Sequence, residues 1–241
     1  MVGRLRRLCR RIGFDIAAFP GAAAHWPQLV TLLEAHGVRV VFDVGANAGQ
    51  YATALFNNGY RGRIVSYEPV AAVHGALTRA AASRPNWEVA PRAAIGARAG
   101  EAVVNISAES DMSSLHAMTA AARTHLSRAR TTGSERVPMV TLADEIFSRA
   151  GAEDRVFVKS DTQGHDAQVL DGLGETAARV VGVQLELALE PVYEGQPRYL
   201  ELLERLEGMG FTARLVIPGY YSRHYGRMLE FDVVAFRDSE D

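Results

Sequence analysis

The chain has 241 residues, 48% of them hydrophobic, which is enough for one large domain with a full core. Its 26 basic and 28 acidic residues leave a net charge of -2, which excludes a general attraction to nucleic acid. Cys9 is the single cysteine, so an internal disulfide and a cysteine-built zinc site are excluded. No apolar stretch approaches the roughly 20 residues of a membrane-spanning helix, and we expect a soluble, cytoplasmic protein.

The chain opens with a basic segment. Arginines alternate with apolar residues at roughly helical spacing in residues 1–14. This pattern suits either a helix on the anionic inner face of a membrane or a solvated helix packed on the domain edge. We expect residues 1–37 to form this basic helix and a lead-in helix, residues 38–237 a single domain, and residues 238–241 an acidic tail.

The first half of the domain alternates strands with helices. The expected helices are 25–36, 48–58 and 70–83, and the expected strands are 38–44, 63–69 and 87–91. Strand 38–44 is apolar throughout, which suits a sheet covered on both faces. The alternation predicts βαβ units and a parallel sheet.

The second half is less regular at first. We expect a strand at 101–107, a loop at 110–118, a helix at 119–130, a break at 131–134 and an extra strand at 137–140. Helices at 142–150, 165–173 and 198–209 then alternate with strands at 155–160, 180–187, 211–217 and 229–236. Too few residues separate the last two strands for a helical crossover, so the last strand is expected to be antiparallel. The sequence predicts a doubly wound, Rossmann-like α/β fold with seven mostly parallel strands and one antiparallel edge strand.

A turn after the first strand has the features of a ligand site. Asp43 is followed by Gly45 and Gly49, and a helix begins there. A dinucleotide fingerprint places its glycines at i, i+2 and i+5, which this spacing does not match. This turn offers a carboxylate, a place where the backbone can approach a ligand closely, and free N–H groups at the start of a helix. These features suit a ligand that carries both an amino and a carboxylate group. A turn with a purely structural role would have the same pattern. Glu68 ends the second strand, where an acid accepts hydrogen bonds from ribose hydroxyls.

The chain contains several short motifs in order. They are Phe42-Asp43-Val44-Gly45-Ala46-Asn47-Ala48-Gly49, Tyr67-Glu68-Pro69, Ser113-Ser114-Leu115, Val140-Thr141-Leu142-Ala143-Asp144 and Val158-Lys159-Ser160-Asp161-Thr162-Gln163-Gly164-His165-Asp166, continuing to Gly172. Together these motifs resemble the FkbM family of S-adenosylmethionine-dependent methyltransferases. The likeness covers about residues 39 to 236. The family pattern has Ile and Glu where this chain has Ser160 and Asp166.

The resemblance implies a class I methyltransferase fold, S-adenosylmethionine as cofactor, and methylation of a hydroxyl group, often on a sugar of a glycolipid or other glycoconjugate. It implies a cofactor site formed by Asp43, Gly45, Ala46, Asn47, Gly49, Tyr51, Glu68, Pro69, Ala93 and Ser114. The acceptor would be a sugar-containing or lipid-linked molecule. No set of side chains has metal-ligand spacing, so the sequence predicts no metal site and leaves open whether a divalent metal takes part.

Transfer of a methyl group to an alcohol requires a group that removes the hydroxyl proton. Asp161 ends the fourth strand of the main sheet, on the rim where α/β sheets bind ligands, and His165 follows one helical turn later. His116 and Glu186 are further candidates, and Lys159, the single lysine, is a candidate buried partner for these acids or for the cofactor. Each also has a structural explanation, such as a helix cap for Asp161 or a surface position for the histidines.

Residues 218–225 interleave tyrosines with Arg223 and His224. They either stack on sugar rings or cover the sheet edge. Two other functions remain open at this point. They are a nicotinamide-dependent oxidoreductase and a non-catalytic carbohydrate-binding protein on the same fold.

Overall fold

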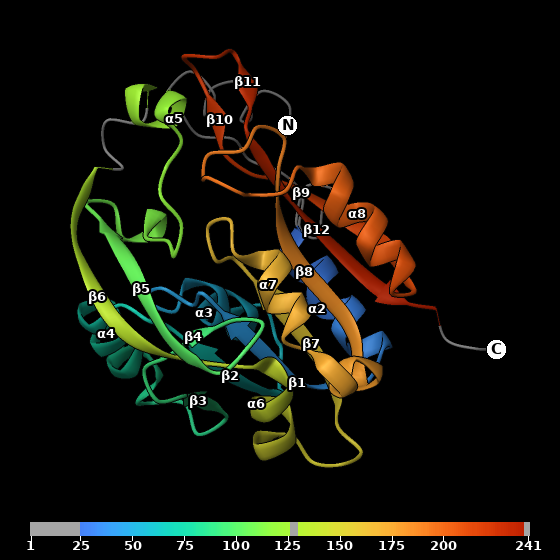
Figure 1. The fold of residues 1–241 in the computed structure, drawn as a ribbon. Coiled ribbons are helices and arrows are strands. Elements are labelled where there is room, and N and C mark those ends of the chain that lie inside the picture. Colours follow the sequence, from blue (N-terminus) through green and yellow to red (C-terminus); the bar gives the residue numbers. More distant parts are fainter. Residues whose placement is uncertain (1–24, 126–129, 239–241) are drawn as a thin grey trace, which may run out of the picture.

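The computed structural model describes residues 25–125 and 130–238. Its main sheet has seven strands in the order β3-β2-β1-β7-β8-β12-β9 (Figure 1). These strands are β1 Val38–Val44, β2 Arg63–Tyr67, β3 Trp87–Val89, β7 Arg155–Ser160, β8 Val180–Ala188, β9 Phe211–Pro218 and β12 Glu230–Arg237. The predicted fold class is confirmed.

The reversed strand is β12, which pairs antiparallel with both β8 and β9. The prediction placed the reversed strand at the sheet edge, whereas in the structure β9 is the edge strand and β12 lies one position inside it. The chain reaches β9 through helix α8 Tyr199–Gly208, which leaves a gap beside β8. The returning strand fills that gap and satisfies its backbone hydrogen bonds on both sides.

Helices cover both faces of the main sheet (Figure 1). They are α2 His25–Ala35, α3 Gln50–Asn57, α4 Ala71–Ala81, α6 Leu142–Arg149, α7 Asp166–Asp171 and α8, with a short 3-10 helix η3 Gly174–Arg179. Val40 and Phe42 belong to one core with Leu142 and Leu202, while Val41 faces a second core around the helices that begin the domain. Successive strand residues point to opposite faces, which explains the uninterrupted apolar run of β1.

A second sheet stands beside the first. Its order is β4-β6-β5, formed by β4 Ala94–Ile95, β5 Gly100–Ser107 and β6 Thr131–Val140. The predicted break at residues 131–134 is wrong, because these residues pair with β5, with Gly133 opposite Ile106. Tertiary pairing here overrides the turn preference of a Thr-Thr-Gly-Ser segment. Of the predicted helix at 119–130, the structure describes α5 Ala120–His125.

Residues 108–118 leave the second sheet and run toward the carboxyl ends of β1 and β7; we call them the cap segment. They include the short helix η1 Ser110–Met112 within the predicted loop.

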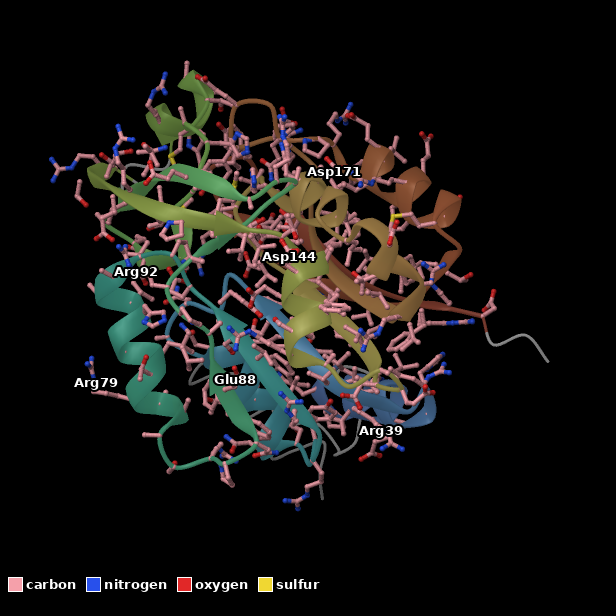
Figure 2. The ribbon with its side chains drawn as sticks, turned by 60° about the horizontal axis from the view of Figure 1, so that its bottom comes forward. Arg39, Arg79, Glu88, Arg92, Asp144 and Asp171 are labelled. Carbon is pink, nitrogen blue, oxygen red and sulfur yellow. The ribbon has the colours of Figure 1, made fainter. Side chains whose placement is uncertain are left out.

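Glu135 of β6 anchors the second sheet, since it accepts hydrogen bonds from the α4 N-terminus at Ala71 (3.0 Å) and from Arg92 (2.8 Å), which is labelled in Figure 2.

Residues 218–228 contain a small hairpin that was not predicted, β10 Tyr221–Ser222 with β11 Arg227–Met228. Tyr220 and Tyr221 remain about half exposed.

No helix in the described part of the chain is both long and apolar enough to cross a membrane. The basic segment at residues 1–14 and all of the acidic tail except Asp238 lie outside the described residues.

The tight contact between β8 and its neighbours gives a test of the core. A Cβ atom on Gly182 would lie 2.5 Å from the Phe236 ring. We expect Gly182→Ala to lower the free energy of unfolding by about 1–3 kcal/mol through overpacking, measured by urea denaturation. The matched control is Gly133→Ala in β6, where nothing lies within 4 Å of the added atom and the change should stay within about 0.5 kcal/mol. Equal losses in both variants would contradict this account.

Candidate cofactor and catalytic site

The turn between β1 and α3 is held against the ends of its neighbouring strands. Gly45 has a φ of +72°, and a Cβ atom there would lie 1.9 Å from the carbonyl oxygen of Asp161. Gly49 has a φ of +91° and would meet the Trp87 ring at 2.6 Å. Both positions therefore need glycine, because the backbone is left-handed there and because an added side chain would collide with a neighbouring residue. The N–H groups of Gly45 and Ala46 donate to the Tyr67 carbonyl of β2.

Glu68 follows β2 and is fixed by two backbone donors. Its carboxylate accepts from the N–H of Asn47 at 3.0 Å and from the N–H of Val70 at 2.8 Å. Burial raises the pKa of Glu68 to about 7, even though both hydrogen bonds oppose the shift. A carboxylate has about four acceptor positions, so two remain for a ligand.

Asp43 and Lys159 form a buried ion pair beneath the turn. Lys159 Nζ lies 3.2 Å from Asp43 Oδ1 and donates to the Gly45 carbonyl at 3.0 Å. Ser66 Oγ donates to the second Asp43 oxygen at 3.1 Å. Burial lowers the pKa of Lys159, but attraction to Asp43 and Asp161 outweighs it and leaves the pKa above its ordinary value. Lys159 is therefore protonated at neutral pH and cannot act as the base.

Two adjoining cavities open over this turn. The first is lined by Glu68, Val70, Ala93, Ile95, Leu115 and His165, among others. The second is lined by Trp26, Ala46, Tyr51, Lys159, Gln184 and Asp232, among others. Gly45, Asn47, Asp111 and Asp161 line both cavities. These four residues therefore mark the junction.

Asp161 is the acid that β7 delivers to this junction. Its side chain is 39% exposed and lies 3.7 Å from Lys159 Nζ. The backbone N–H of Asp161 donates to the Val44 carbonyl, so its position follows from the pairing of β1 with β7. Asp161 lies before α7 but does not cap it, because the residue at the cap position is His165.

His116 of the cap segment contacts His165, which lines the first cavity. Their ring nitrogens Nε2 and Nδ1 lie 3.0 Å apart. Burial and the neighbouring His116 lower the pKa of His165 to about 4, and burial lowers the pKa of His116. Both rings are neutral at pH 7, and one proton shared between the two nitrogens satisfies the hydrogen bond.

The two departures from the family pattern contact each other. Ser160 Oγ donates to Asp166 Oδ1 at 2.6 Å, and the same oxygen accepts from the hydroxyl of Thr162 at 3.0 Å. Asp166 is 2% exposed, so these hydrogen bonds compensate its burial. Asp166 is shorter than the Glu of the family pattern, and its hydrogen-bond partner is the hydroxyl of Ser160, which stands where the pattern has Ile.

Most of the expected cofactor residues lie together. Gly45, Asn47, Glu68, Pro69, Ala93 and Ser114 line the first cavity, and Gly45, Ala46, Asn47 and Tyr51 line the second. Asp43 has no exposed surface and Gly49 packs on Trp87, so these two support the turn from below. Sequence reasoning missed Trp26, Asp111, Gln184 and Asp232, which reach the cavities from α2, the cap segment, β8 and β12. Among the described residues, no three His, Cys, Asp or Glu side chains are arranged to hold a metal ion.

The buried pair yields a stability test. Lys159→Met leaves the Asp43 carboxylate buried without its partner, and we expect a loss of about 3–5 kcal/mol in the free energy of unfolding. Asp43→Asn combined with Lys159→Met leaves no buried charge and keeps an acceptor for Ser66. The double variant should therefore be more stable than Lys159→Met alone. Denaturant titration of the three proteins measures both effects, and a loss below about 1 kcal/mol in the single variant would argue against the pair.

Comparison with known proteins identifies the family. The family model of the methyltransferase FkbM domain matches residues 43–213. No curated protein matches the sequence. Solved structures that resemble the chain include the O-methyltransferase of Bacillus cereus in complex with S-adenosylhomocysteine, with 11% identity and a TM-score of 0.49 over 98% of this chain and 90% of that one. Another is the magnesium protoporphyrin IX methyltransferase of Synechocystis PCC 6803 with bound S-adenosylmethionine, with 14% identity and a TM-score of 0.47 over 98% and 91%. Because the family model covers more than half of the chain, the protein belongs to the FkbM family of S-adenosylmethionine-dependent methyltransferases.

Proposed function

We propose that this protein transfers the methyl group of S-adenosylmethionine to a hydroxyl oxygen, on a sugar of a glycolipid or related glycoconjugate. The observation that carries this proposal is the pair of cavities joined at Asp161, one of which contains Glu68. The first cavity would take the adenosine part of the cofactor, the second its methionine part.

The first cavity fits an adenosine group. Glu68 is held by backbone donors with acceptor positions to spare for the two ribose hydroxyls. Val70, Ala93, Ile95 and Leu115 supply an apolar surface for the adenine ring. Asn47, whose side-chain amide lies 3.3 Å from Ser110 Oγ, occupies the turn where a dinucleotide fingerprint has glycine. The nicotinamide alternative therefore has no support in this turn.

The second cavity fits an amino acid group. The protonated Lys159 is a cation for its carboxylate, and Asp111, which lines the same cavity, is an anion for its ammonium. Tyr51 forms part of the wall and is fixed by a hydrogen bond of 2.9 Å from its hydroxyl to Gln184. The sulfonium that links the two parts of the cofactor would then lie near the junction.

Asp161 is the proton acceptor that this arrangement favours. Bound S-adenosylmethionine supplies an electrophilic methyl group, so the protein must orient an acceptor oxygen and take its proton. Asp161 lies at the junction with a partly exposed carboxylate. His165 faces the adenosine side and is hydrogen-bonded to His116, while Lys159 already carries a proton.

The acceptor is proposed from the family resemblance and from two exposed tyrosines of residues 218–228. Carboxylates accept hydrogen bonds from sugar hydroxyls, and half-exposed Tyr220 and Tyr221 offer ring faces for stacking on sugars. The basic segment at residues 1–14 would bring the enzyme to a lipid-linked acceptor on the inner face of the membrane. The tyrosines and the basic segment thus concern binding of the acceptor, whereas the two cavities concern binding of the methyl donor.

Binding of S-adenosylhomocysteine should depend on pH through Glu68. The ribose hydroxyls need the ionised carboxylate, so binding lowers a pKa that is about 7 in the free protein. Affinity should therefore rise with pH up to about 7 and then level off, being about tenfold weaker at pH 6 than at pH 8. Calorimetry at several pH values measures this.

In Glu68→Gln we expect binding at pH 8 to weaken by about tenfold or more and the pH dependence to disappear. Asp232, whose pKa is also raised to about 7 by burial, lines the second cavity, so Asp232→Asn is the matched control and should keep the dependence. An unchanged pH dependence in Glu68→Gln would remove Glu68 from the cofactor site.

The acceptor is tested with isotope-labelled S-adenosylmethionine and purified glycolipid fractions. We expect label on a sugar oxygen, located by mass spectrometry. Asp161→Asn should reduce transfer by about 100-fold or more, which is the range for loss of a positioned base. Label on nitrogen or carbon would contradict O-methylation. Cofactor binding without transfer to any fraction would favour the non-catalytic alternative.

A further inference from the structure

Gln163 has a backbone conformation that is unusual for its residue type. It lies in the turn between β7 and α7 with a φ of +54°, in the left-handed region that disfavours side chains. The following residue, Gly164, also has a positive φ. Such conformations persist where the surrounding contacts hold them, and they cluster at functional sites.

The side-chain amide of Gln163 supplies these contacts. Its Nε2 donates to Asp161 Oδ1 at 2.9 Å and to Glu186 Oε2 at 3.0 Å. Its Oε1 accepts from the hydroxyl of Tyr193 at 2.9 Å. An uncharged amide can donate twice and accept at the same time, which suits a position between two carboxylates and a phenol.

The same residue contacts the cap segment. Ser114 Oγ donates to the backbone carbonyl of Gln163 at 2.6 Å. The Tyr193 hydroxyl that faces Gln163 also lies 3.1 Å from the carbonyl of Met112. Gln163 therefore connects the cap segment, the end of β7 and the end of β8, and its own atoms line the first cavity.

We propose that Gln163 is a positioning residue for methyl transfer, whose amide keeps the Asp161 carboxylate directed at the methyl group. This inference rests on the proposed function, in which Asp161 accepts the proton. Without the amide donor, the Asp161 carboxylate would lose the contact that holds it beside Glu186. Attraction to the Lys159 ammonium, 3.7 Å away, would then turn Asp161 toward Lys159.

The test compares two cofactor analogues and needs no acceptor. S-adenosylhomocysteine lacks the methyl group, whereas sinefungin carries an amino group in its place. An Asp161 carboxylate directed at that position should make sinefungin bind more tightly than S-adenosylhomocysteine to the full chain. We expect Gln163→Leu to reduce this preference by about tenfold, as Asp161→Asn should, with less change in affinity for S-adenosylhomocysteine.

Two further variants complete the experiment. Gln163→Gly adopts the left-handed backbone without strain and should therefore still fold, yet it should lose the same preference. Gln168→Leu makes the same chemical change on α7, where the Gln168 Oε1 has no hydrogen-bond partner, and should keep the preference. A preference for sinefungin that survives in Gln163→Leu and Gln163→Gly overturns the inference and leaves the proposed function intact. Absence of binding by both analogues to the natural protein overturns the proposed function, and the inference with it.

Discussion

The buried ion pair of Asp43 and Lys159 organises the site. It joins β1 to β7 at adjacent positions of the sheet, and the same ammonium donates to the Gly45 carbonyl in the turn above. A buried charge is tolerated only when it is paired and hydrogen-bonded, so this arrangement permits little alternative geometry. The glycine turn and the end of β7 are consequently held together, and Gly45 can approach the Asp161 carbonyl closely.

From this anchor the site divides into two sides with different chemistry. On the first side, Glu68 follows β2, and Ile95 and Val104 of the second sheet form part of an apolar wall. On the other side, α2, α3 and β8 contribute Trp26, Tyr51 and Gln184. The cap segment contacts both, because Ser110 lies against Asn47 and Ser114 against the Gln163 carbonyl. Cap and turn therefore form one hydrogen-bonded unit around the junction.

The features that the sequence predicted are local ones. Strand periodicity, the glycine turn and the acid after β2 all depend on neighbouring residues, and the predicted site residues Gly45, Asn47 and Glu68 line the first cavity. The missed features depend on contacts between distant segments. The start of β6 is decided by pairing with β5, and Trp26 and Asp232 reach the second cavity from elements whose arrangement no local pattern reveals. The left-handed conformation of Gln163 likewise has no signal in its residue type.

Ser160 and Asp166 show why a departure from a family pattern must be judged in three dimensions. Considered separately, an acid that is one methylene shorter would lose a contact, and a hydroxyl in a buried strand would lack a partner. In the structure each supplies what the other needs, at 2.6 Å, and Asp166 also accepts from the backbone N–H of Thr162. The turn that carries Asp161 and Gln163 is thereby tied to the start of α7. Together Ser160 and Asp166 support the turn of the candidate base, so neither departure leaves that turn without a hydrogen-bonded anchor.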